Sequence, residues 1–338
     1  MSAEPTQSTL TNNALISPER LLDVKELKKY FPIRKGVFKS VVGQVRSVDG
    51  VTFHLNQGET LGLVGESGCG KTTTSRCLLR AINPTSGEIR YRQADGQLVD
   101  VTQLASDQLR PVRREMQMIF QDPYSSLNPR MTVGEIVGEG LRLQPELSAS
   151  DVQDRVAHWL KLVGLSPDHR SRYPHEFSGG QRQRIGIARA LILQPEFVVC
   201  DEPISALDVS VQAQVVNLLG ELTEELGLTL LFIAHDLSMV RYISDRMAVM
   251  YLGGLVEIGT SSEVFFDPKH PYTQTLIASN PEADPNHERN RQSTTIQGEI
   301  PSPVNVPAGC RFANRCPQAM PHCSTTMPAL KPVPTTSE

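Results

Sequence analysis

The chain has 338 residues, enough for two domains of ordinary size, and 39% of them are hydrophobic, which suffices for a buried core. The formal net charge is −4 and both signs are interspersed, so no basic stripe indicates a nucleic acid as the main partner. The longest apolar runs, such as residues 228–234, have strand length and are too short to span a membrane. The start of the chain lacks the basic-then-apolar order of a signal peptide, and we expect residues 1–20 to form a disordered tail. These features predict a protein of cytosolic character that contacts a membrane only through a partner.

Two predicted strands, residues 21–27 and 47–55, open the ordered part of the chain as a small antiparallel sheet. Between them, Tyr30 and Phe31 place two aromatic rings ahead of a glycine-rich stretch. An aromatic ring at this place can stack on a flat apolar base such as adenine, because the base prefers a ring to water. Ordinary packing under a loop is an equally open interpretation of these two residues.

The glycine-rich stretch lies between a predicted buried strand, residues 61–64, and a predicted helix, residues 72–81. Its pattern, Gly65-x-x-x-x-Gly70-Lys71-Thr72, is that of a P-loop. The glycines allow backbone N–H groups to surround a polyphosphate, and the start of the helix adds positive potential. Lys71 can reach the outer phosphates, and the Thr72 hydroxyl suits Mg²⁺. A turn that binds nothing is the alternative, but the pattern in this context favours a nucleoside triphosphate. The predicted binding residues are Gly65, Glu66, Ser67, Gly68, Cys69, Gly70, Lys71, Thr72 and Thr73.

A helical insert is predicted after the strand that ends at Gln121. Apolar residues recur there at helical spacing, so we expect a helical subdomain at about residues 122–180. The turn Ser178-Gly179-Gly180-Gln181 then opens a helix predicted at residues 182–193. Free N–H groups and the positive end of the helix dipole can bind an anion at such a turn, although many helices begin with Ser and Gly for structural reasons.

A strand at residues 197–200 runs directly into Asp201 and Glu202. A core strand tolerates carboxylates only at its end, where they can meet water, a metal ion or a substrate. Asp201 is predicted to hold Mg²⁺, directly or through water, and Glu202 to polarise an attacking water. The alternative is a pair of solvated acids, which the P-loop upstream makes less favoured.

His235 occupies a comparable place, because it follows the buried strand at residues 228–234. The ends of parallel strands meet at one edge of a sheet, where ligands bind, whereas a solvated loop histidine is the alternative. Before this strand, a loop ending at Asp208 leads into an amphipathic helix at residues 209–226. After it, residues 246–259 are predicted to form a hairpin that turns at Gly253-Gly254.

The chain changes character from about residue 261, where proline becomes frequent and the apolar periodicity fades after Ile277. Residues after about 280 are predicted to be rich in loops and too poor in large apolar residues to form a core without help. Three of the six cysteines, Cys310, Cys316 and Cys323, cluster in this part. In a protein of cytosolic character such a cluster indicates metal binding or free thiols before it indicates disulfides.

These motifs resemble an ABC-type ATPase in their order and approximate spacing over about residues 21–265. The resemblance implies an α/β P-loop fold with a mixed central sheet, an antiparallel N-terminal subdomain and a helical subdomain. Phe177 stands where that family's signature most often has Leu, which is a conservative departure. The resemblance implies that Phe31 stacks on adenine, with Tyr30 as the alternative. The resemblance assigns catalysis to Glu202, His235 and Gln121, Mg²⁺ binding to Thr72, Gln121 and Asp201, and ATP binding to the P-loop with Phe31, Ser178, Gly179, Gly180, Gln181 and Asp208.

A narrower resemblance joins residues 121–132, 270–273, 298–303 and 309–317 to the oligopeptide/dipeptide importer ATPases. That subfamily carries a C-terminal extension, expected here at residues 266–338, and some members hold an iron–sulfur cluster there through four cysteines. Cys310, Cys316 and Cys323 match three of them, and no fourth follows before Glu338, so the chain is truncated or the site is incomplete. A [4Fe-4S] cluster is therefore an expectation, with Zn²⁺ and free thiols as alternatives.

The implied function is ATP hydrolysis that energises a membrane importer. Di- or oligopeptides are the favoured substrates, and nickel or glutathione are the alternatives. The implied partners are two transmembrane permease subunits, a second ABC ATPase subunit that is homologous or identical, and indirectly an extracytoplasmic binding protein. The expected location is the cytoplasmic face of the cell membrane. A soluble ABC ATPase of DNA repair or translation is the rival, but the long coiled-coil insertion or tandem ATPase unit that would favour it is absent. Glu202 and His235 argue against a paralogue that does not hydrolyse ATP.

Overall fold

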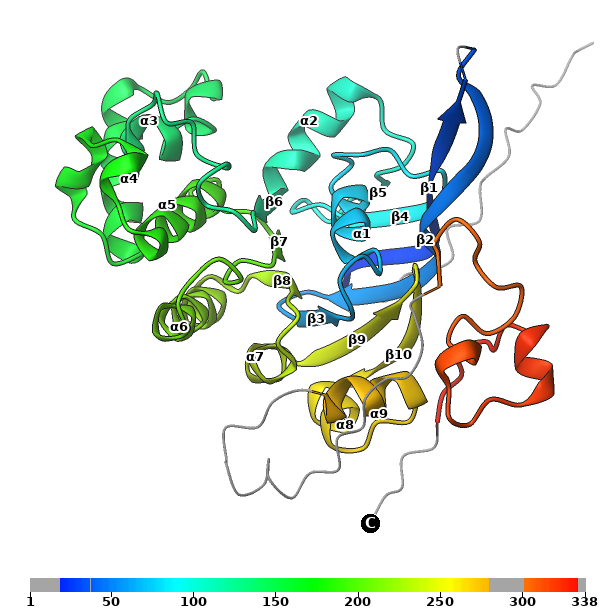
Figure 1. The fold of residues 1–338 in the computed structure, drawn as a ribbon. Coiled ribbons are helices and arrows are strands. Elements are labelled where there is room, and N and C mark those ends of the chain that lie inside the picture. The colour runs from blue at the N-terminus through cyan, green and yellow to red at the C-terminus, as the bar shows by residue number, and fades with distance from the viewer. Residues whose placement is uncertain (1–18, 37, 280–300, 334–338) are drawn as a thin grey trace, which may run out of the picture.

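Two sheets form the body of the protein (Figure 1). The computed structural model describes residues 19–36, 38–279 and 301–333. One sheet has six strands in the order β10-β9-β3-β8-β7-β6, and the other has four in the order β2-β1-β4-β5. The strands are β1 (Arg20–Lys35), β2 (Ser40–Asn56), β3 (Thr60–Val64), β4 (Ser86–Arg92), β5 (Leu98–Asp100), β6 (Met116–Ile119), β7 (Phe197–Asp201), β8 (Thr229–Ile233), β9 (Arg246–Tyr251) and β10 (Gly254–Thr260).

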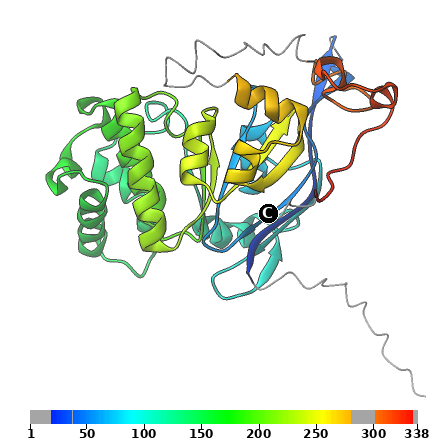
Figure 2. The same cartoon turned by 90° about the horizontal axis from the view of Figure 1, so that it is seen from below.

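The helices cover the sheets, and three of them form a separate lobe. The α-helices are α1 (Lys71–Leu78), α2 (Ser106–Glu115), α3 (Val133–Val137), α4 (Ala149–Leu162), α5 (Gly179–Leu191), α6 (Val209–Leu226), α7 (Leu237–Ile243), α8 (Ser261–Phe266) and α9 (Pro271–Ala278). Short 3-10 turns lie at Leu141–Leu143, Pro167–Ser171, Pro174–Glu176, Ala313–Arg315 and Pro321–Ser324. Helices α3, α4 and α5 form a lobe at one end of the molecule, and residues 301–333 lie at the other end (Figures 1 and 2). Within the described ranges, no helix has the length and apolar composition needed to cross a membrane.

The central strands β3, β7 and β8 are buried along their whole length and run parallel to one another. Their continuous apolar sequences follow from this position, because both faces of the sheet are covered. Alternate residues of β7 belong to different cores: Val198 and Cys200 face the helices, whereas Val199 faces the antiparallel sheet. Asp201 is in register with Ile233, so β7 and β8 end at the same edge. The strands predicted here are confirmed.

Strand β1 is longer than predicted, because it continues through Tyr30 and Phe31 to Lys35. These aromatic residues therefore lie within a strand and not between two strands. Beyond Lys28, β1 pairs only with β2 among the described strands, so Pro32 lies on a strand with one free side, where proline is tolerated. The disordered tail predicted for residues 1–20 lies mostly outside the described residues, and β1 already begins at Arg20.

The part of the chain expected to form the helical insert carries α3, α4 and the first residues of α5, and none of the described strands. Val156 and Leu160 of α4 are buried with Trp159, as the helical spacing indicated. Helix α5 begins three residues earlier than predicted, at Gly179, because Ser178 caps it. The Ser178 side chain accepts from the Gln181 N–H at 3.4 Å, and the Gln181 side chain accepts from the Ser178 N–H at 3.0 Å. This reciprocal capping box is a strong local helix start.

The C-terminal region, which we define as residues 301–333, packs on the body without long elements of its own. Phe312 is 1% exposed, and its ring centroid lies 5.3 Å from that of Tyr251 and 5.4 Å from that of Tyr272. The region thus joins the core of the body, in line with the prediction that it needs help to form one. Helices α8 and α9 precede it and were not predicted from the proline-rich sequence. Residues 280–300 and 334–338 of the predicted extension lie outside the described residues.

Candidate nucleotide site

The P-loop joins the end of β3 to the start of α1, and two of its glycines are sterically required. Gly65 has a φ of 148°, and a Cβ atom there would lie 2.1 Å from the carbonyl oxygen of Met250. Gly70 has a φ of 113°, and its Cβ atom would lie 2.2 Å from the carbonyl oxygen of Ser47. Both conformations are unfavourable for residues with a side chain. The loop is therefore shaped by backbone packed against β9 and β2.

Lys71 is the cation of this loop, and it is only 5% exposed. Its Nζ atom donates to the carbonyl oxygens of Gly65 at 2.7 Å and Glu66 at 3.2 Å. The ammonium group is thus held inside the curve of the loop, where it can also bind phosphate oxygens. Burial raises the pKa of the Cys69 thiol, so its side chain is neutral. The Cys69 N–H donates to the carbonyl oxygen of Glu66 at 3.2 Å.

Thr72 and Asp201 lie in contact although 129 positions separate them. The Thr72 hydroxyl donates to Oδ1 of Asp201 at 2.9 Å, and Asp201 is 2% exposed at the end of β7. Burial raises the pKa of the Asp201 carboxyl. A hydroxyl and a carboxylate at the end of a core strand are oxygen ligands of the kind that Mg²⁺ takes. These residues therefore fit the Mg²⁺ site that the sequence predicts.

Glu202 directs its side chain to a different partner from that of its neighbour Asp201. Gln121 follows β6, and its Nε2 atom donates to Oε2 of Glu202 at 2.7 Å. Glu202 has a φ of 48°, in the left-handed region, and its N–H donates to the carbonyl oxygen of Ile233 at 2.9 Å. The left-handed turn at the strand end lets the two adjacent carboxylates separate. One faces the start of α1, and the other faces Gln121.

His235 and Asp208 lie at the same side of the body as these acids by topology. His235 is exposed and comes two residues after the end of β8, whose last residue is level with Asp201. Asp208 is exposed and stands immediately before α6. Among the described contacts, no hydrogen bond or ion pair links either side chain to the P-loop, so their predicted roles depend on a bound nucleotide or on another chain.

The turn Ser178-Gly179-Gly180-Gln181 lies in the helical lobe, apart from α1 and the P-loop (Figure 1). A Cβ atom on Gly180 would lie 2.4 Å from Cγ1 of Val211, so glycine permits the close packing of α5 on α6. No hydrogen bond of the described residues joins this turn to the P-loop. Within one chain, the structure gathers the P-loop, Gln121, Asp201 and Glu202, but it does not add the 178–181 turn to them.

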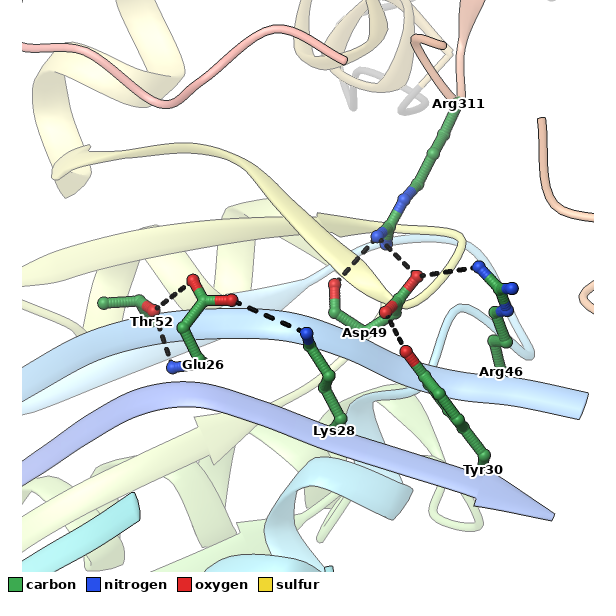
Figure 3. Close-up of polar contacts among 7 residues, drawn as sticks. All are labelled: Glu26, Lys28, Tyr30, Arg46, Asp49, Thr52 and Arg311. Atoms are coloured by element: carbon green, nitrogen blue, oxygen red, sulfur yellow. Dashed lines mark hydrogen bonds and ion pairs between the residues drawn. The ribbon is translucent and has the colours of Figure 1, made fainter. Parts of the chain in front are cut away.

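The two candidate aromatic residues differ in their surroundings, and Figure 3 shows those of Tyr30. The Tyr30 hydroxyl donates to Oδ1 of Asp49, and burial together with this carboxylate raises the pKa of Tyr30 to about 12. Phe31, the next residue along β1, is 38% exposed. Neighbouring residues of a strand point to opposite faces, so the Tyr30 ring lies on the face toward Asp49 and the Phe31 ring lies on the other face. Phe31 is thus the ring that remains accessible for stacking.

One set of contacts at the P-loop was not predicted from the sequence. Arg315 binds the Glu66 carboxylate with both terminal guanidinium nitrogens, at 2.9 and 3.0 Å. The Tyr272 hydroxyl accepts from the Glu66 N–H at 2.9 Å. Glu66 was predicted as a nucleotide-binding residue, whereas its side chain is occupied by this pair. Arg315 lies 249 positions from Glu66, and no spacing rule in a single sequence connects them.

The three C-terminal cysteines do not fit the predicted cluster. Cys310, Cys316 and Cys323 are free and half-buried, and the Cys310 N–H donates to the carbonyl oxygen of Cys323 at 2.7 Å. In the part of the chain that the structure describes, no three His, Cys, Asp or Glu side chains are grouped so that they could hold a metal ion. The iron–sulfur expectation is therefore unsupported, because these thiols do not converge on one point.

This fold and site define an ABC transporter ATPase. The ABC transporter family matches residues 48–205, and the family described as the oligopeptide/dipeptide transporter C-terminal region matches residues 256–323. A dimeric ATP-binding cassette in a post-hydrolysis state with ADP and Pi has a similar structure, with a TM-score of 0.62 and 26% sequence identity over 71% of this chain and 99% of that chain. The predicted α/β cassette fold, with its mixed central sheet and antiparallel subdomain, is thereby confirmed.

Individual relatives narrow the assignment. The oligopeptide transport ATP-binding protein OppF of Salmonella typhimurium is 52% identical over 323 residues, which cover 94% of this chain and 95% of the relative. The oligopeptide transport ATP-binding protein AppF of Bacillus subtilis is 51% identical over 314 residues, which cover 93% of this chain and 94% of the relative. The chain belongs to the family of oligopeptide ABC transporter ATP-binding proteins.

Proposed function

We propose that this ATPase hydrolyses Mg²⁺–ATP in a site shared with a second ABC ATPase subunit, and that hydrolysis energises oligopeptide import through two permease subunits. The observation that carries the proposal is the pair of contacts Thr72–Asp201 and Gln121–Glu202 beside the P-loop. These contacts bring a hydroxyl and a carboxylate that can bind Mg²⁺, and a candidate general base, to one edge of the sheet. Parallel sheets bind their ligands at this edge.

Each side chain has one role in this proposal. Lys71 and the loop N–H groups bind the phosphates, and Phe31 stacks on adenine. Thr72, Asp201 and Gln121 would hold Mg²⁺, which neutralises charge that develops on the phosphate oxygens when it is bound. Glu202 accepts the proton of the attacking water, and His235 contacts the terminal phosphate. The remaining P-loop residues, Gly65, Glu66, Ser67, Gly68, Cys69, Gly70 and Thr73, shape the loop or offer backbone N–H groups.

A second subunit supplies the rest of the site. Ser178, Gly179, Gly180 and Gln181 offer a capped helix start with N–H groups, but in the lobe away from their own P-loop. A head-to-tail pair would bring this turn and Asp208 of one chain to the nucleotide of the other. The similarity to cassettes described as dimeric supports this arrangement. The partner ATPase is homologous or identical, and both versions give the same composite geometry.

The names of the relatives and the matched C-terminal region support an oligopeptide as the transported substrate. We therefore place the protein at the cytoplasmic face of the cell membrane, held there by the permease subunits and served by an extracytoplasmic binding protein. No described feature favours nickel, glutathione or nucleic acid as the substrate.

Glu202→Gln tests the assignment of the general base. The variant should bind Mg²⁺–ATP as the wild type does and lose turnover by about 10²–10⁴-fold, because the amide cannot accept the proton of the water. Phosphate release and ATP titration measure the two effects. Glu224→Gln, on the exposed side of α6, is the matched control and should keep full turnover. Near-normal hydrolysis by Glu202→Gln would show that Glu202 is not the general base.

A further inference from the structure

Among the described residues of the C-terminal region, Arg315 is the one whose side chain hydrogen-bonds to the P-loop. Its guanidinium binds both carboxylate oxygens of Glu66, at 2.9 and 3.0 Å, and donates to the Tyr251 hydroxyl at 3.1 Å. The side chain of Arg315 is 5% exposed and that of Glu66 is 20% exposed, so water and salt screen this pair only weakly. A bidentate pair between Arg and a carboxylate is among the strongest polar contacts and also fixes orientation.

Glu66 is held by its backbone as well. Its N–H donates to the hydroxyl of Tyr272, which comes from α9 and is fully buried. The Tyr272 ring packs on Tyr251, with 4.6 Å between the ring centroids, so the acceptor has a fixed position. The carbonyl oxygen of Glu66 accepts from Lys71 at 3.2 Å. Every polar group of this loop residue is therefore bound, and two of its partners come from residues beyond 270.

A separate arginine attaches the C-terminal region to the body (Figure 3). Arg311 is 7% exposed and donates to the carbonyl oxygen of Leu252 at 2.9 Å and to that of Asp49 at 2.8 Å. It also pairs with the Asp49 carboxylate at 3.1 Å. Near it, the Arg46 N–H donates to the carbonyl oxygen of Pro303 at 2.9 Å. Attachment thus has contacts of its own besides the bond between Arg315 and Glu66.

We propose that Arg315 is a positioning residue of the nucleotide site, which acts through Glu66 to hold the P-loop in the conformation that binds ATP. The inference rests on the nucleotide site proposed above. A loop with Gly65, Gly68 and Gly70 has many accessible backbone conformations, and ordering it costs conformational entropy. The pair with Arg315 meets that cost before ATP arrives. The apparent affinity for ATP is the intrinsic affinity multiplied by the fraction of molecules with a competent loop.

Arg315→Gln should raise the KM for ATP about tenfold, the effect expected if one molecule in ten retains a competent loop. The kcat should stay within about twofold of the wild-type value, since Gln121 and Glu202 lie just beyond the ends of β6 and β7 and keep their contact. Arg315→Lys keeps the charge but cannot bind both oxygens of Glu66, so its KM should lie between those of the wild type and Arg315→Gln. Lys269→Gln removes an exposed cation paired with Asp267 in the same half of the chain and should leave both constants unchanged.

Glu66→Ala separates positioning from charge neutralisation. If Arg315 positions the loop, Glu66→Ala alone raises the KM, and the double variant with Arg315→Gln is no worse than the poorer single variant. If Arg315 only neutralises a carboxylate near the phosphates, Glu66→Ala has a wild-type KM and restores ATP affinity to Arg315→Gln. The second result would overturn the proposal, as would additive effects in the double variant.

Two further measurements keep the outcome interpretable. ATP titrated into each variant on a Glu202→Gln background gives the dissociation constant without turnover. Reaction of the half-buried Cys310, Cys316 and Cys323 with a thiol reagent reports whether the C-terminal region stays attached, and it should not change in Arg315→Gln. If replacing Lys71 left ATP binding unchanged, the proposed nucleotide site itself would be wrong. Lys71-dependent binding with equal constants for wild type and Arg315→Gln would remove only the role of Arg315.

Discussion

Glu202 is the residue where local geometry departs most from the ordinary at the site. A non-glycine residue with a φ of 48° carries a conformational cost of about 1–3 kcal/mol. The conformation follows directly on a buried strand and turns the carboxylate toward Gln121. Strain of this kind at a strand end separates two adjacent acids into a candidate metal ligand and a candidate base.

At the same scale, Tyr30 and Phe31 give a matched pair of variants. Phe31→Ala should raise the KM for ATP about threefold to tenfold, because a stacking ring contributes about 1 kcal/mol beyond its buried area. Tyr30→Phe should leave the KM unchanged and lower the free energy of unfolding by about 1 kcal/mol, because it removes one hydrogen bond to Asp49. Steady-state kinetics and urea unfolding measure the two effects. If Tyr30→Phe raised the KM and Phe31→Ala did not, the stacking assignment would pass to Tyr30.

At the scale of elements, helix α9 carries a pH-sensitive start. His270 precedes it, and its Nδ1 atom accepts from the Tyr272 N–H at 3.1 Å. Burial lowers the pKa of His270 below its usual 6.5, so the folded protein favours the neutral ring. The unfolded chain binds the proton more readily. The stabilisation is therefore complete above about pH 6.5 and is lost as the pH falls toward the lower pKa of the folded state.

His270→Asn should remove this dependence while keeping a side chain that can cap the helix. Between about pH 7.5 and about pH 5.5, the thermal midpoint of the wild type should fall further than that of the variant. Burial also lowers the pKa of His54, which both proteins share, so the difference between them isolates His270. His158→Asn, on the exposed side of α4, serves as the control. Equal losses in wild type and His270→Asn would show that the cap does not titrate.

The elements that could be predicted from the sequence are those with long apolar patterns. The buried strands ending at Val64, Asp201 and Ile233 were predicted within one or two residues, because their apolar runs reflect burial on both faces. The hairpin of β9 and β10 was also predicted, although it turns at Leu252-Gly253 and not at Gly253-Gly254. Helices α7, α8 and α9 were missed, since helices of six to eight residues show too few turns for a periodic pattern.

The site could be predicted only where a motif encodes it. The P-loop, Asp201 and Glu202 follow from local sequence, and the structure brings them together with Gln121. The contact of Arg315 with Glu66 depends on the docking of the C-terminal region, which no local pattern describes. The cysteines mark the opposite limit, because closeness in sequence did not bring their thiols to one point.

At the scale of the whole molecule, we propose different tasks for the two ends of the body. The helical lobe presents the 178–181 turn and, in the proposed transporter, faces the second subunit and the permease. The C-terminal region holds the P-loop from the opposite end through Glu66. Opening and closing of the pair would then move the lobe while the C-terminal region keeps the P-loop in shape.

Oligopeptide uptake by vesicles tests whether two chains share the catalytic site. The vesicles contain the permease subunits, this ATPase with its partner subunit, and the binding protein. The decisive variant is Ser178→Arg, which leaves its own P-loop intact and fills the turn that the other chain's nucleotide would meet. We expect ATP-dependent uptake with the wild type, and normal ATP binding without uptake or hydrolysis at the facing site in the variant. Uptake by Ser178→Arg at the wild-type rate would contradict a catalytic site shared between two chains.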